Sequence, residues 1–214
     1  MTKLLHLDTE TYSPTAITAG THRYAEDVEV MVFAYGRDDG EIKSWDRTAD
    51  DRMPAELEDS LLDERVQLVC HNSHFDRTVI RHSMGLDLPP ERWFDTMVCA
   101  MAHSLPGSLE KLGEIFKLPQ DQRKLKIGKD LVQLFCKPRP KNMHLRRATR
   151  HTHPVEWAKF VEYAAHDVIA MRALYHKMPK WNYPREQELW ALDQRINDRG
   201  FAVDMDLVLS LIHI

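Results

Sequence analysis

The sequence predicts an α/β domain in which a mixed β-sheet is flanked by helices. Short apolar runs rich in β-branched residues alternate with longer segments whose apolar residues recur every three or four positions, the pattern of strands alternating with helices. Residues 28–35 and 41–45 flank a turn at 37–40, which predicts an antiparallel hairpin and therefore a mixed sheet. Of the 214 residues, 43% are hydrophobic and 29% charged, so the chain can bury a substantial core.

The strands are predicted from short apolar runs, the first of which ends in acidic residues. In chain order they span residues 3–8, 28–35, 41–45 and 66–70. The helices are predicted from apolar periodicity and from proline or glycine at their ends. They span residues 54–62, 75–84, 96–103, 109–116, 130–135, 154–178 and 186–197. Residues 179–184 contain two prolines and predict a linker.

The composition and the cysteine spacing indicate in which cellular compartment the protein is expected. No apolar run is long enough to cross a membrane, and charges at the N-terminus argue against a secretory signal. The three cysteines lie far apart and form no CxxC pair, which is typical of a reducing compartment. We therefore expect a cytoplasmic protein, in a bacterium or a phage-infected host cell.

Charge is unevenly distributed along the chain. Between Arg123 and Arg150 there are ten Lys or Arg residues and a single acid, Asp130, whereas the remainder carries 19 basic and 32 acidic residues. A basic segment on an acidic body is consistent with a polyanionic partner held beside a cation site, or with a solvated insertion that has no partner.

Asp8 and Glu10 are separated by one residue at the end of the first predicted strand. Alternate strand residues point to the same face, so the two carboxylates would lie together. Such a pair is favourable when a divalent cation sits between the two charges. Two solvated acids at a strand end would give the same pattern, which is weak evidence when taken alone.

Asp76 follows the strand at 66–70 and lies in the first turn of the next predicted helix. Ligands commonly collect at this edge of open α/β sheets. Asn72 at the same turn could cap that helix. In the long helix at 154–178, the four-residue spacing places Tyr163 and Asp167 on one face. An aspartate among apolar residues is costly to bury unless something such as a metal ion compensates its charge.

In combination the three motifs are far more specific. Leu7-Asp8-Thr9-Glu10-Thr11, His71-Asn72-Ser73-His74-Phe75-Asp76 and Tyr163-Ala164-Ala165-His166-Asp167 occur in the order strand, strand–helix, helix. From residue 1 to about 178 the chain resembles the DEDD 3′-5′ exonucleases of the RNase H-like fold. Tyr163 stands where the tyrosine branch of that superfamily has its tyrosine. Glu162 stands where the histidine branch has its histidine. Asp95 is interpreted as an N-cap or supporting residue.

The resemblance implies a catalytic set of four metal-binding carboxylates and one tyrosine. Asp8 would bridge two Mg²⁺ or Mn²⁺ ions about 3.5–4 Å apart. Glu10 and Asp167 would complete one shell, Asp76 would hold the other ion, and Tyr163 would orient the attacking water. The implied substrate is the 3′ end of single-stranded DNA. Candidate substrate contacts comprise residues near the motifs and basic residues of the charged segment: Thr9, Thr11, Asn72, Phe75, Lys124, Lys126, Lys129, Arg146 and Arg147.

The last part of the chain resembles the junction that follows the proofreading exonuclease in phage-type family A DNA polymerases. We expect an exonuclease domain at 1–178, then at 179–208 a linker and the start of a truncated polymerase domain, which would act in cis. Residues 209–214 are what CTG-TCT-CTT-ATA-CAC-ATC would encode, a transposon end used in sequencing libraries, so they are expected to be an artefact.

Two other functions fit the sequence less well. An RNase D-type exoribonuclease shares the tyrosine motif, but the polymerase-like tail argues against it. A catalytically silent nucleic-acid-binding module is expected to have lost one or more of the carboxylates, and none is missing.

Overall fold

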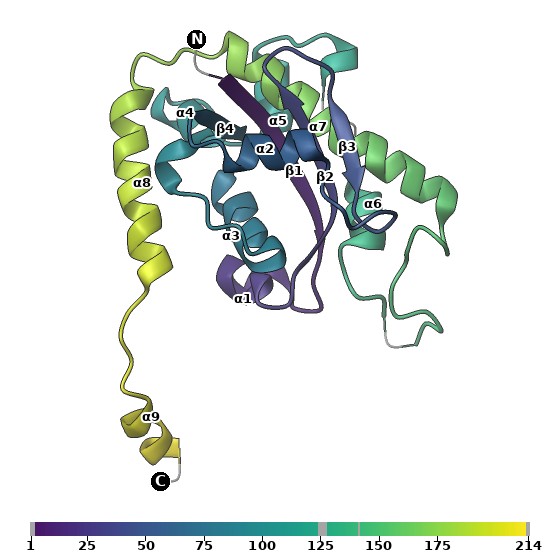
Figure 1. Cartoon of the computed structure of the whole chain (residues 1–214), viewed down its shortest axis with the longest axis vertical. Coiled ribbons are helices and arrows are strands. Elements are labelled where there is room, and N and C mark those ends of the chain that lie inside the picture. Colours follow the sequence, from purple (N-terminus) through teal and green to yellow (C-terminus); the bar gives the residue numbers. More distant parts are fainter. Residues whose placement is uncertain (1–2, 124–127, 141, 213–214) are drawn as a thin grey trace.

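The computed structural model describes residues 3–123, 128–140 and 142–212. Its centre is a five-stranded sheet in the order β3-β2-β1-β4-β5 (Figure 1). The strands are β1 (Lys3–Tyr12), β2 (Glu29–Arg37), β3 (Lys43–Asp46), β4 (Val66–Cys70) and β5 (Trp93–Asp95). The β1–β2 and β2–β3 pairs are antiparallel, and the β1–β4 and β4–β5 pairs are parallel. The predicted mixed sheet is therefore confirmed.

Helices cover both faces of this sheet. They are α1 (Thr21–Ala25), α2 (Ala55–Leu62), α3 (Ser73–Met84), α4 (Thr96–Ala102), α5 (Leu109–Ile115), α6 (Gly128–Phe135), α7 (Pro154–Lys177), α8 (Tyr183–Arg199) and α9 (Met205–Ile212). Three short 3₁₀ turns lie at Ile17–Ala19, Pro90–Arg92 and Gln120–Gln122. Leu5 and Leu7 of β1 enter a core that includes α2 and α3, whereas Leu4 packs against a second core that includes α7. Strand alternation thus divides β1 between two apolar layers.

The structure extends some predicted elements and adds others. β1 continues to Tyr12 because β2 pairs with it as far as Glu29, so Asp8 and Glu10 lie inside a strand rather than at its end. β5 was not predicted because three residues are too few to show a period, yet it is fully buried beside β4. The helix predicted at 75–84 begins at Ser73, and α8 already begins at Tyr183 within the predicted linker.

Helix α8 packs along the edge of the molecule beside α4 (Figure 1). The buried Tyr183 hydroxyl accepts a hydrogen bond from the backbone N–H of Asp95 at 2.7 Å. Arg77 of α3 pairs with Asp198 of α8. Beyond Gly200 the chain leaves the body and reaches α9, whose described side chains are not buried.

Within the described ranges, no helix is both long enough and apolar enough to cross a membrane.

Candidate functional site

Strand β1 carries the first two carboxylates past the end of its parallel partner. β4 pairs with β1 only from Lys3 to His6, so Asp8 and Glu10 lie where the two strands separate. Leu5 and Leu7 of β1 point into the core on the α3 side of the sheet, so the alternating residues His6, Asp8 and Glu10 point to the opposite face. On that face the His6 ring contacts the Tyr175 ring of α7 edge-on. Glu10 is buried and Asp8 is half-buried. The Asp-x-Glu spacing therefore directs both acids toward α7.

Asp76 reaches the same region from the first turn of α3. Its Oδ1 accepts hydrogen bonds from the Thr9 backbone N–H at 2.9 Å and from the Thr9 hydroxyl at 2.6 Å. Its Oδ2 accepts from the Cys70 thiol at 3.0 Å. Burial raises the pKa of Asp76 to about 6, although these hydrogen bonds oppose the shift. Thr9, predicted to contact the terminal nucleotide, thus fixes the orientation of Asp76.

Asp95 determines how α3 begins. Asn72 occupies the N-cap position in the left-handed region (φ 67°), and its side chain makes no capping hydrogen bond. Instead, Asp95 accepts from the backbone N–H groups of Asn72 at 3.1 Å and Ser73 at 2.7 Å. Asp95 also caps α4 through the N–H groups of Met97 and Val98. The N-cap interpretation of Asp95 is confirmed. The alternative that Asn72 caps α3 with its side chain is wrong, because a buried carboxylate on β5 accepts these hydrogen bonds instead.

Helix α7 contributes the remaining acid and the tyrosine. Tyr163 and Asp167 are both buried, one turn apart on the face that packs against the sheet. Burial, together with the charges of Asp167 and Glu10, raises the pKa of the Tyr163 phenol, so its proton is retained. A Cβ atom at Gly128, the first residue of α6, would lie 2.2 Å from Cε2 of Tyr163. Gly128 therefore lets α6 pack directly against the tyrosine ring.

The four acids converge as two overlapping groups. Single ligand atoms of Asp8, Glu10 and Asp167 lie within 4.8 Å of one another. The same holds for Asp8, Cys70 and Asp76. Each group is compact enough for its donors to surround one cation, and Asp8 belongs to both.

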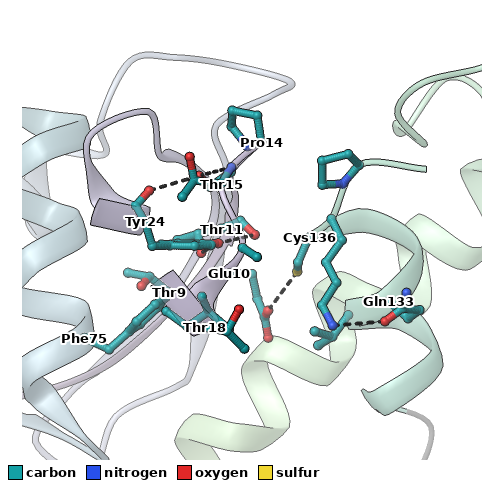
Figure 2. Close-up of a pocket in the computed structure, with 16 residues that line it drawn as sticks. Thr9, Glu10, Thr11, Pro14, Thr15, Thr18, Tyr24, Phe75, Gln133 and Cys136 are labelled. Atoms are coloured by element: carbon teal, nitrogen blue, oxygen red, sulfur yellow. Dashed lines mark hydrogen bonds between the residues drawn. The ribbon is translucent and has the colours of Figure 1, made fainter. Parts of the chain in front are cut away.

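A cavity of about 530 Å³ opens beside Glu10 (Figure 2). One wall comes from the end of β1 and the segment that follows, and the opposite wall comes from α6 and Cys136. The Thr11 and Tyr24 hydroxyls are hydrogen-bonded at 2.8 Å, and the Tyr24 ring contacts Phe75 at a centroid distance of 5.7 Å. The cavity thus places aromatic and hydroxyl groups next to the carboxylates.

The basic residues have different environments. Lys129 and Arg146 are exposed. Arg147 is half-buried, donates to Glu29 at 2.6 Å and lies over the Tyr12 ring at 3.9 Å. It therefore anchors the basic segment to the sheet. Lys124 and Lys126 lie outside the described residues.

Among the described residues, Cys70, Cys136 and Gly128 contact the site but were not among the predicted ones, and the Sγ of Cys136 lies 3.8 Å from Oε2 of Glu10. Cys70 and Gly128 touch Asp76 and Tyr163, respectively. The sequence offers only a weak signal for Cys70, as the last residue of the strand before the Asp76 motif. For Gly128 the sequence offers no such signal, because its contact with the Tyr163 ring depends on how α6 packs against α7.

Solved structures with a similar fold support the predicted fold class. NrnC from Brucella melitensis has a TM-score of 0.57 at 16% sequence identity, covering 92% of this chain and 85% of that one. Its Mg²⁺-bound form has a TM-score of 0.53 at 16% identity, covering 92% and 86% of the respective chains. These similarities, together with the mixed sheet flanked by helices, confirm the predicted RNase H-like fold.

Sequence comparison then identifies the family. A family model described as 3′-5′ exonuclease matches residues 5–181, and the chain belongs to this family of 3′-5′ exonucleases. A DNA polymerase of Bacillus phage SP02 is 37% identical over 96% of this chain. The matched part is 33% of that polymerase, so the chain spans about one third of its relative's length.

Proposed function

We propose that this exonuclease removes nucleotides one at a time from the 3′ end of single-stranded or frayed DNA, with two divalent cations, Mg²⁺ or Mn²⁺, at the carboxylates. The observation that carries the proposal is the position of Asp8 in both ligand groups. Asp8, Glu10 and Asp167 would hold one ion, and Asp8 with Asp76 would hold the other. When bound, the ions would supply an activated water and stabilise the charge on the leaving 3′ oxygen.

The side chains around the carboxylates have complementary tasks. Tyr163 keeps its proton and so is a donor that can orient a water for in-line attack on the last phosphodiester. Thr9 fixes one oxygen of Asp76 with two hydrogen bonds, and the Cys70 thiol donates to the other. Gly128 lets α6 close against Tyr163 and so limits the positions its ring can take. The product would be a nucleoside 5′-monophosphate.

The cavity beside Glu10 is the proposed site of the terminal nucleoside. Its volume, about 530 Å³, falls in the range of small-molecule pockets. Phe75 and Tyr24 offer aromatic surfaces against which a base can stack, and Thr11 lies beside them. Because only an unpaired end can enter such a cavity, a duplex would have to fray first.

The exposed basic residues Lys129 and Arg146 are proposed to contact phosphates further along the strand. Such contacts release counterions from the nucleic acid, so binding should weaken steeply as salt concentration rises. Arg147 is proposed to act in the same region but from an anchored position, since Glu29 and Tyr12 already hold its guanidinium.

A proofreading role is supported by the similarity to a DNA polymerase across 96% of this chain. In that interpretation residues 179–208 lead into a polymerase domain in cis, and the exonuclease removes its misincorporated nucleotides.

The test is digestion of a 5′-labelled DNA strand in Mg²⁺, with the released nucleotide identified and an RNA strand of the same sequence run in parallel. We expect stepwise shortening of DNA and release of 5′-monophosphates. Faster shortening of RNA would instead indicate an RNase D-type exoribonuclease. Binding without shortening in either Mg²⁺ or Mn²⁺ would indicate a silent binding module.

A further inference from the structure

The thiol of Cys70, the last residue of β4, lies directly against Asp76. The side chain is fully buried, and its Sγ donates a hydrogen bond to Oδ2 of Asp76 at 3.0 Å. Thr9 occupies the other oxygen of that carboxylate with two hydrogen bonds. A cation that binds Asp76 through Oδ2 would therefore also meet the sulfur of Cys70.

Asp8 completes this group of donors. The ligand atoms of Asp8, Cys70 and Asp76 all lie within 4.8 Å of one another. Three donors at about 2.0–2.3 Å from one ion, the usual zinc–oxygen and zinc–sulfur distances, span separations of this size. The second group found among the described residues, Asp8 with Glu10 and Asp167, consists of three carboxylates. The two proposed cation positions thus differ in their donor chemistry.

We propose that Cys70 makes the Asp8–Asp76 position a mixed oxygen–sulfur site for thiophilic divalent cations such as Zn²⁺ and Cd²⁺. The inference rests on the proposed function, because it concerns the second of the two cation positions. Thiolate ligands favour such ions, whereas carboxylates and water suit Mg²⁺. On binding, the sulfur coordinates as a thiolate and its proton passes to solvent, with no change of oxidation state. A thiophilic ion held there would displace Mg²⁺ and inhibit the exonuclease.

The other two described cysteines provide matched controls. Cys136 is also buried, and its Sγ lies 3.8 Å from Oε2 of Glu10, beside the other cation position (Figure 2). Cys99 is buried too, but its thiol donates to the Pro179 carbonyl at 3.4 Å. Cys136→Ser therefore removes a thiol beside a carboxylate of the other cation position, and Cys99→Ser removes a thiol that contacts a backbone carbonyl.

The experiment is a Cd²⁺ titration of the metal-free full chain, followed by the sulfur-to-cadmium charge-transfer absorption. We expect the band in the wild-type protein, in Cys99→Ser and in Cys136→Ser. In Cys70→Ser the band should vanish and the affinity for Cd²⁺ should fall at least 10–100-fold, the loss seen even for outer-shell partners of a metal. A full band in Cys70→Ser, its loss in Cys136→Ser, or no band in the wild-type protein would overturn the proposal.

A second pair of variants leaves the cysteine in place. Asp76→Asn should remove or strongly weaken the band, because it alters a ligand of the same position, whereas Asp167→Asn should retain it. Circular dichroism checks that each variant is folded. Digestion by the wild-type protein in Mg²⁺ alone reports on the proposed function, so its failure and the failure of the Cys70 assignment give different results.

Discussion

Two neighbouring residues of α3, Asp76 and Arg77, are buried to the same degree but in opposite electrostatic environments. Asp76 is 3% exposed and Arg77 is 1% exposed. The hydrogen-bond donors to Asp76 in the described part of the chain, Thr9 and Cys70, are neutral. Arg77 instead has an ionic partner on α8: it donates to Asp198 at 2.6 and 3.0 Å.

The pKa values of the two acids reflect this difference. Burial raises the pKa of Asp76 to about 6. Partial burial also acts to raise the pKa of Asp198, but its hydrogen bonds and ion pairs with Arg77 and Arg81 outweigh this and lower it below the ordinary value. A buried charge that has a counter-ion within the protein, such as Arg77 with Asp198, holds two helices together. A buried acid held only by neutral donors is poised to accept a cation from solution. One helix thus supports both the α8 contact and the proposed metal site.

The largest expected effect comes from removing acids of the proposed metal site. Asp8→Ala or Asp167→Ala should reduce Mg²⁺-dependent DNA shortening by roughly 10³-fold or more, equivalent to at least about 4 kcal/mol in transition-state stabilisation. Gel analysis of a 5′-labelled strand measures this loss, and thermal unfolding verifies the fold. Near-normal turnover in Asp167→Ala would show that the metal assignment is wrong.

The α8 contact can be broken from either side. Arg77→Met should lower the free energy of unfolding by about 3 kcal/mol, because it leaves Asp198 without its main partner in a partly buried place. Asp198→Asn is the matched change, which preserves shape while removing the negative charge. Denaturant unfolding measures both variants. If both were as stable as the wild-type protein, the pair would be incidental to the packing of α8.

The sequence predicts the four carboxylates and Tyr163 because local periodicity fixes their directions. Two-residue spacing in β1 places Asp8 beside Glu10, and four-residue spacing in α7 places Tyr163 above Asp167. The order of the motifs then specifies the fold class. These inferences need no knowledge of how the remaining side chains pack.

Contacts between distant segments could not be predicted in this way. The ion pair between Arg77 and Asp198 joins residues 121 positions apart, so no local pattern reveals it. Asp95 was expected to cap a helix, but its second role at the start of α3 depends on the pairing of β5 with β4. The contact of Cys70 with Asp76 likewise depends on where β4 ends relative to α3.

Asp76→Asn tests the consequence of burying Asp76 among neutral hydrogen-bond donors, in contrast to the Arg77–Asp198 ion pair. Because the folded-state pKa of about 6 lies above the ordinary 3.8, the folded protein binds this proton more tightly than the unfolded chain does. The stabilisation of the folded protein by the Asp76 proton is therefore fully present below about pH 4 and is lost as pH rises through about 6. At pH 7 and without metal, the variant should be more stable than the wild-type protein by roughly 3 kcal/mol.

The measurement is thermal unfolding of both proteins across pH 4–8 with EDTA, taken as the difference between them. The difference cancels other groups, including the buried His6, whose pKa burial lowers to about 4 and which therefore destabilises the fold as pH falls from 6.5. Mg²⁺ at pH 7 should then stabilise the wild-type protein more than the variant. A difference that did not change with pH would mean that Asp76 titrates normally.

The smallest expected effect separates Tyr163 from the carboxylates. Tyr163→Phe keeps the ring that packs against Gly128 and all four carboxylates, but removes a hydroxyl that also hydrogen-bonds to Asp167. The rate should fall roughly 10-fold, or about 1.4 kcal/mol, because the attacking water loses a donor that orients it while the cation ligands remain. Single-turnover digestion at saturating Mg²⁺ measures this. A loss as large as that of Asp167→Ala would mean that Tyr163 is needed for more than orientation, whereas an unchanged rate would remove it from the catalytic set.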